Sequence, residues 1–159
     1  MSAAKARGRF EAAVAEFIRC IEALSSDQLL APLGKWTPRD IVAHLIGWNR
    51  YVVRGSRQLQ RGELPFYDVD PGENFGKVNA ALVEEYPEAD GVELLSELRK
   101  SADELCAFLD ALEESEWQRD FGVRHGDEVL TIRGTVDELI RDYPHHREQI
   151  ETWVDTPSS

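Results

Sequence analysis

The chain has 159 residues, of which 42% are hydrophobic and 30% are charged, a balance typical of one globular domain. Its net charge of −12 argues against nucleic acid or an anionic membrane surface as a partner, because phosphate groups are bound by clustered Lys and Arg. No apolar run approaches the roughly 20 residues of a membrane span, and Cys20 and Cys106 are too few for a disulfide framework, so we expect a cytoplasmic location.

The first predicted helix covers residues 5–25. Phe10, Val14 and Phe17 begin an apolar stripe that recurs at three- and four-residue spacing, which is typical of one buried helix face. Residues 25–35 then contain Ser, Pro and Gly and follow no such period, so they are predicted to connect the first helix to the second.

The second predicted helix covers residues 37–61. Thr37 is a favourable N-cap, and Pro38 suits the first helical position, where its missing N–H costs nothing. Residues 62–73 follow; they are rich in Pro, Gly and Asp and are predicted to form a loop.

Two further helices are predicted in the middle of the chain. The shorter one covers residues 74–85, and the longer one covers residues 90–112 with Asp90 as its cap. The apolar residues of the longer helix, beginning with Val92 and Leu95, are expected to face the core.

Residues 117–134 fit no helical period. A His-Gly-Asp sequence between two apolar runs predicts a turn, and we expect a short β-hairpin near residues 119–133. The last helix is predicted at residues 135–154, with Thr135 and Glu138 forming a capping box.

These elements predict an all-α fold, a four-helix bundle with long connections and the short hairpin. Residues 1–155 are expected to form one domain and residues 156–159 a disordered tail.

An internal repeat supports the division into two halves. Thr37 and Thr135 are 98 positions apart, and the same offset pairs His44 with Asp142. If the two halves pack as equivalent helix pairs, His44 and Asp142 lie at the same depth on two helices.

This pairing suggests a metal site. Asp142 and His146 are four residues apart and therefore share one helix face. Together with His44 they offer two imidazoles and one carboxylate, a set that zinc, nickel, iron and manganese all accept. Three protein ligands would leave positions open for water or substrate.

Less specific interpretations of the same residues stay open. A single histidine such as His44 on an apolar face is often a hydrogen-bonded core residue, and the pair His145 and His146 could be a solvated feature near the end of a helix. His125 lies in the predicted turn, where we expect it to be exposed and without a function. Trp48 could line a pocket or belong to the core.

Three segments carry a resemblance to a known family. WTPRDIVAHLIGW at residues 36–48 resembles the second-helix signature of the DinB-like four-helix bundle superfamily. DYPHHREQI at residues 142–150 resembles the last-helix pattern of that superfamily. FGKVNAALV at residues 75–83 is similar to the third-helix start of its ClbS/DfsB-like and mycothiol-dependent branches.

The resemblance implies a divalent metal held by His44 and by positions 142 and 146. Position 142 is usually His in the family; the Asp142 of this chain has a shorter reach and a harder oxygen, which shifts the preference away from soft metals. By resemblance alone, Asn79 is expected to line the same cavity. Asn79 and Trp48 are the expected cofactor-binding residues, and a low-molecular-weight thiol is a candidate for the cofactor.

The resemblance also leaves several functions open. Relatives include thiol-dependent transferases and proteins that hydrolyse reactive electrophiles, so we expect a metal-dependent hydrolase or thiol transferase that acts on a small electrophilic molecule. The alternatives are a non-catalytic small-molecule or metal-binding protein of a stress response, and a structural dimerising bundle without metal. The expected partners are a small-molecule ligand and a second copy of the chain, with no nucleic acid and no membrane.

Overall fold

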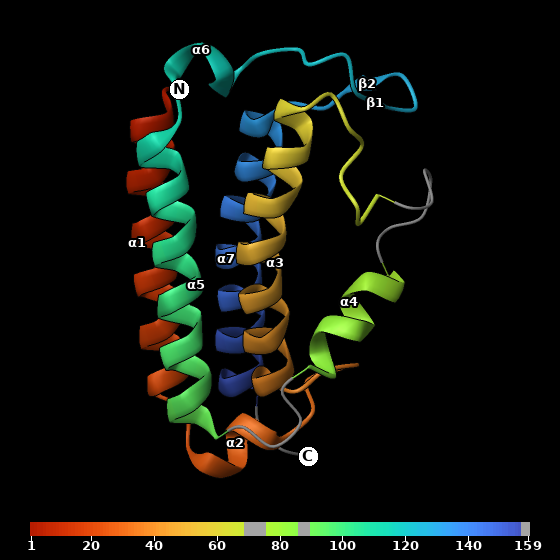
Figure 1. The fold of residues 1–159 in the computed structure, drawn as a ribbon. Coiled ribbons are helices and arrows are strands. Elements are labelled where there is room, and N and C mark those ends of the chain that lie inside the picture. Colours follow the sequence, from red (N-terminus) through yellow and green to blue (C-terminus); the bar gives the residue numbers. More distant parts are fainter. Residues whose placement is uncertain (69–75, 86–89, 157–159) are drawn as a thin grey trace.

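Four long helices run side by side in the computed structural model, which describes residues 1–68, 76–85 and 90–156 (Figure 1). They are α1 (Ala3–Glu22), α3 (Pro38–Gln60), α5 (Gly91–Ala111) and α7 (Ile132–Asp155). The helices contact one another in a ring, α1 against α5 and α7, and α3 against α5 and α7. The predicted helical bundle is therefore confirmed.

The direction of the helices explains the long connection in the middle of the chain. In Figure 1 the colours show α3 and α5 running in the same direction, and α1 and α7 running in the opposite one. The chain must therefore return along the whole length of α3 before α5 begins. This return contains the short helix α4 (Gly76–Val83), which packs against α3.

Polar side chains define where the long helices begin. Ser2 caps α1, and Thr37 caps α3, where it forms a capping box with Asp40. The side chain of Asp90 accepts a hydrogen bond from the Glu93 backbone at the start of α5. A capping side chain of this kind typically contributes about 1 kcal/mol by satisfying a backbone N–H that has no partner within the helix.

The start of α7 differs from the prediction. The N-cap is Thr131, whose Oγ1 accepts from the Gly134 backbone at 3.0 Å, so the predicted capping box of Thr135 and Glu138 is wrong. Thr135 instead lies in the first turn and donates its hydroxyl proton to the Thr131 carbonyl. Burial of the Ile132 side chain, which is fully inaccessible to solvent, accounts for the earlier start.

Three smaller features depart from the sequence analysis. Two short helices, α2 (Ser26–Leu30) and α6 (Glu114–Trp117), occur where no helix was predicted. Val92 was expected to face the core but is 79% exposed, because it lies in the first turn of α5, where the bundle ends. Of the predicted tail, residues 157–159 lie outside the described residues.

The predicted hairpin is confirmed. Strands β1 (Arg124–His125) and β2 (Glu128–Val129) pair in antiparallel fashion. Gly126 supplies the positive φ of 60° that this tight turn requires. None of the helices in the described part of the chain is long and apolar enough to cross a membrane.

A buried polar network joins three helices in the core. The Tyr143 hydroxyl on α7 donates to Asn49 Oδ1 on α3 at 2.7 Å, and Asn49 Nδ2 donates to Ser101 Oγ on α5 at 3.0 Å. Ser101 in turn donates to the Leu98 carbonyl. Asn49, Ser101 and Tyr143 have no exposed surface, so these bonds fix how the three helices are placed along one another.

Replacing Tyr143 by Phe should lower the free energy of unfolding by about 1–3 kcal/mol, because Asn49 Oδ1 would stay buried without its donor. Urea denaturation followed by circular dichroism measures this change. Tyr51→Phe, at a half-buried position on the same bundle, serves as the control and should change stability less. A loss no larger for Tyr143→Phe than for the control would contradict the role of the network.

Candidate metal site and cavity

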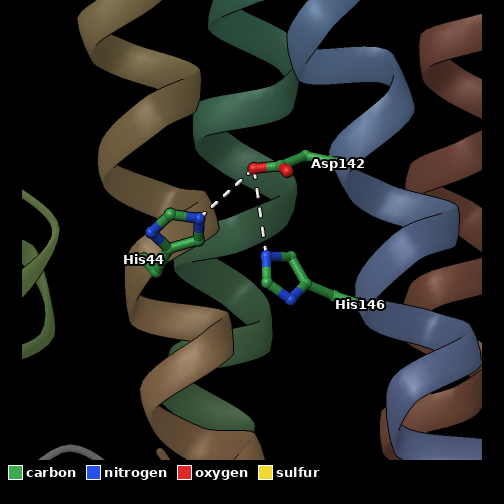
Figure 2. A group of neighbouring side chains, drawn as sticks. All are labelled: His44, Asp142 and His146. Atoms are coloured by element: carbon green, nitrogen blue, oxygen red, sulfur yellow. Dashed lines mark hydrogen bonds and ion pairs between the residues drawn. The ribbon is translucent and has the colours of Figure 1, made fainter. Parts of the chain in front are cut away.

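The structure brings together the three residues that the sequence analysis proposed as metal ligands. His44 comes from α3, and Asp142 and His146 come from successive turns of α7 (Figure 2). One ligand atom from each residue lies within 4.8 Å of the other two. His44 and His146 are buried, whereas the Asp142 side chain is 40% exposed. The three side chains therefore converge at the boundary between the core and solvent.

Asp142 is the centre of this group. Its Oδ2 atom accepts a hydrogen bond from His44 Nε2 at 3.3 Å and lies 3.9 Å from His146 Nε2. Burial disfavours the charged form of Asp142, but the hydrogen bond from His44 and the charges of the neighbouring histidines outweigh it and lower the pKa of the carboxyl group. Asp142 is therefore an ionised carboxylate at neutral pH.

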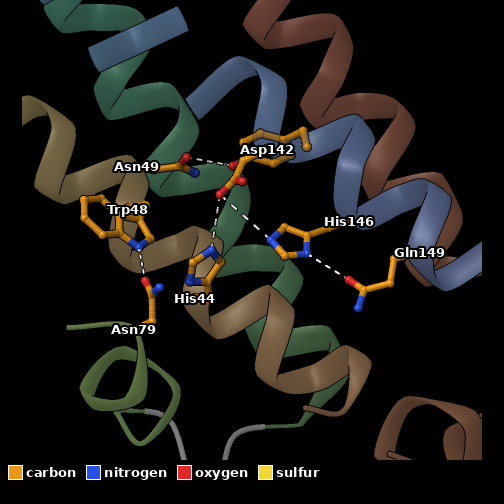
Figure 3. A network of polar contacts seen from close by, with 8 residues as sticks. His44, Trp48, Asn49, Asn79, Asp142, His146 and Gln149 are labelled. Carbon is orange, nitrogen blue, oxygen red and sulfur yellow. Dashed lines mark hydrogen bonds and ion pairs between the residues drawn. The ribbon is translucent and has the colours of Figure 1, made fainter. Parts of the chain in front are cut away.

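His146 is held in a suitable orientation to bind a cation. Its Nδ1–H donates to Gln149 Oε1 at 3.3 Å (Figure 3), which leaves the lone pair of Nε2 for a ligand. Burial lowers the pKa of His146, so the ring is neutral at neutral pH. The Nε2 atom with its lone pair then faces the negative Asp142 oxygen, and a cation bound between the two atoms would stabilise this arrangement.

The spacing of the three groups fits a transition metal. Ligands about 2.0–2.2 Å from a tetrahedral zinc ion stand roughly 3.4 Å apart. The contact between His44 and Asp142 has this spacing, and His146 lies slightly farther away. The Nδ1 atom of His44 is buried without a hydrogen-bond partner among the described residues, so only its Nε2 side is anchored in the structure.

A cavity of about 390 Å³ opens beside this group. His44 and Asp142 form part of its wall, together with Trp48 and Asn79, and Trp48 Nε1 donates to Asn79 Oδ1 at 2.7 Å (Figure 3). Both residues therefore line this cavity, and their contact with a cofactor stays a prediction. A Cβ atom at Gly47 would collide with the Leu82 side chain, so glycine at this position allows α4 to approach α3 and to place Asn79 there.

The wall of the cavity also contains a residue pair that the sequence analysis missed. His125 was expected to be exposed and without a function, but its side chain is 26% exposed and its Nδ1 lies 2.8 Å from both oxygens of Asp68. Asp68 is buried, and both residues line the cavity. Their separation of 57 residues explains why no local pattern indicated the pair. His145 is exposed, as expected.

Most of the chain matches a known protein family. The family model of the DinB superfamily matches residues 9–150. No curated protein matches the chain.

Several solved structures share the fold. The colibactin self-resistance protein ClbS, in complex with a dsDNA, superimposes with a TM-score of 0.79 at 15% identity, over 99% of this chain and 98% of ClbS. DfsB, a sibling lethal factor precursor, gives a TM-score of 0.80 at 17% identity, over 96% and 95% of the two chains. An uncharacterised protein from Clostridium difficile 630 gives 0.81 at 14% identity, over 99% and 98%. At this level of identity the similarity shows the fold alone.

The ring of His125 should titrate above the ordinary histidine value of 6.5, because the hydrogen bond and charge of Asp68 raise its pKa. The stabilisation that this pair provides is complete below pH 6.5 and is lost as the pH rises through the raised pKa. NMR titration of the His125 ring measures the midpoint, and Asp68→Asn should lower it. A midpoint at or below 6.5 in the unaltered protein would contradict this assignment.

Proposed function

Because the chain belongs to the DinB superfamily, we propose that it binds one divalent metal through His44, Asp142 and His146 and hydrolyses a small electrophilic molecule. The observation that carries this proposal is the convergence of three ligand atoms from α3 and α7, two of them from residues that line a cavity, His44 and Asp142. Zinc, nickel, iron and manganese all accept two imidazoles and a carboxylate. Such a metal supplies Lewis acidity, which activates water and polarises a carbonyl group.

The residues of the chain have separate roles in this proposal. The ring of His146 is oriented by Gln149, and the charge of Asp142 offsets part of the charge of the metal. The cavity volume of about 390 Å³ suits a small molecule rather than a polymer. Trp48 gives the cavity an aromatic surface against which an apolar part of the substrate can pack.

Hydrolysis is favoured over thiol transfer by the character of the cavity. Neither Cys20 nor Cys106 is among the residues that line it, so a transferase would need a separate thiol cofactor. Among the described lining residues there are four carboxylates and no Lys or Arg. A thiol cofactor that carries carboxylates would be repelled by this wall.

The relatives offer partial support for a protective role. ClbS is a self-resistance protein, which is consistent with the removal of a reactive small molecule. The complex of ClbS with a dsDNA gives no such support, because the net charge of −12 of this chain opposes binding to a phosphate backbone. The absence of a nucleic-acid partner, the cytoplasmic location and the homodimer stay predictions.

Metal binding should require all three proposed ligands. Isothermal titration with zinc, nickel and manganese should give one bound ion per chain, and His44→Ala, Asp142→Asn and His146→Ala should each weaken binding by about a hundredfold or more. Gln149→Ala should weaken it by about 10–100-fold, because the His146 ring loses its orienting acceptor. His145→Ala, an exposed position beside His146, is the matched control and should bind normally. Normal binding by the His146→Ala variant would contradict the site.

Hydrolysis should depend on the bound metal. The metal-loaded protein should cleave p-nitrophenyl acetate, a chelator should abolish the reaction, and added metal should restore it. A protein that binds metal but consumes an electrophile such as 1-chloro-2,4-dinitrobenzene only with added thiol would establish the transferase alternative. Metal binding with no turnover of either probe would favour the non-catalytic alternative.

A further inference from the structure

The pair formed by Asp68 and His125 lies outside the proposed metal site but in the same cavity. Asp68 follows α3, and His125 belongs to β1 of the hairpin, so the pair connects two segments that are 57 residues apart. Both oxygens of Asp68 are 2.8 Å from the same ring nitrogen, Nδ1 of His125. The proposed metal site uses neither residue.

The burial of Asp68 explains why His125 has a fixed orientation. The carboxylate is 3% exposed, and an ionised group at such a depth is strongly unfavourable without a partner. The Nδ1–H of His125 supplies this partner. The second ring nitrogen, Nε2, has no hydrogen bond within the described part of the chain and is the nitrogen left for a ligand.

The cavity connects this pair to the proposed metal site. Its wall follows α7 from the N-cap Thr131 to Asp142, eleven residues further on, which corresponds to roughly 16 Å at 1.5 Å per residue. The hairpin that contains His125 lies at the end of the bundle where α7 begins (Figure 1), whereas His44 contacts Asp142 farther along α7. A molecule that contacts both histidines is therefore elongated.

The charges around His125 indicate which chemical group it would bind. The negative groups that act on it are Asp68, Glu128 on β2 and Glu138 on α7. Glu128 and Glu138 also line the cavity, and no Lys or Arg does so among the described residues. This wall repels an anionic group. An uncharged oxygen can approach and accept a hydrogen bond from the imidazolium.

We propose that His125, held by Asp68, donates from Nε2–H to a carbonyl or hydroxyl oxygen of an elongated, uncharged substrate. The reactive group of that substrate lies where His44 and Asp142 line the cavity, beside the proposed metal site. The placement of the reactive group rests on the proposed function. The hydrogen bond from His125 to the substrate does not depend on that function.

Two p-nitrophenyl esters test the inference. The acetate has no carbonyl or hydroxyl oxygen beyond its reacting ester group, whereas the N-acetylglycylglycine ester carries additional carbonyl oxygens. His125→Phe should raise KM for the longer ester by roughly ten times the factor by which it changes KM for the acetate, and it should change kcat of both esters alike. Asp127→Asn, in the same turn but outside the cavity wall, is the matched control and should behave as the unaltered protein does.

The pH dependence separates a ligand-binding role from a structural one. In the unaltered protein, KM for the longer ester should rise as the pH increases through the pKa of His125, since deprotonation removes the Nε2–H donor. Asp68→Asn should move this rise to lower pH. Either role predicts lower thermal stability in His125→Phe, because Asp68 loses its partner. A pair that only fastens the hairpin predicts that this substitution changes the KM values of the two esters by the same factor, and this result would overturn the inference.

A binding measurement keeps this inference separate from the proposed hydrolysis. N-acetylglycylglycine p-nitroanilide is an uncleaved analogue of the longer ester, and NMR titration of the metal-free protein gives its dissociation constant. Weaker binding by roughly tenfold in His125→Phe supports the role of His125 even if neither ester is hydrolysed, in which case the proposed function alone fails. Equal binding by both proteins, or no binding by the unaltered protein, overturns the inference.

Discussion

Asn49 lies at the centre of the bundle with no exposed surface, and its amide therefore needs partners inside the protein. It finds them on two other helices, Tyr143 on α7 and Ser101 on α5. An apolar core tolerates a helix that slides by part of a turn, whereas a buried hydrogen bond does not, because a small displacement leaves polar atoms unpaired. Tyr143 also packs edge-on against Phe10 and Phe17 of α1. The contacts of Asn49 and Tyr143 therefore hold all four long helices in fixed positions relative to one another.

The position of Asp142 follows directly from this constraint. It precedes Tyr143 in the chain, so fixing Tyr143 on Asn49 also fixes Asp142 relative to α3. His44 lies on α3 about one turn before Asn49, and its Nε2 reaches the Asp142 carboxylate. The core network thereby determines which polar groups meet at the cavity, although none of its own atoms belongs to the proposed metal site.

Local sequence signals predicted the long helices well and their ends less well. Thr37 and Asp90 were identified as caps because each precedes a clear apolar period. Thr135 was preferred over Thr131 because Glu138 follows at capping-box spacing, but the burial of Ile132 outweighed that pattern. The offset of 98 residues paired His44 with Asp142, and these two side chains do meet, although the N-cap of α7 lies four residues before Thr135. His125 could not be predicted in this way, because its partner Asp68 is reached only through the tertiary fold.

The carboxylate at position 142 determines how the ligand set of this proposed metal site could change by mutation. A site of three histidines has no internal counter-charge, whereas Asp142 already accepts a hydrogen bond from His44. The codons of aspartate and histidine differ only in their first base. One point mutation in the gene would therefore convert this site into the three-histidine form, and the reverse mutation would restore it. The core bonds of Asn49 and Tyr143 would remain, because they do not involve that side chain.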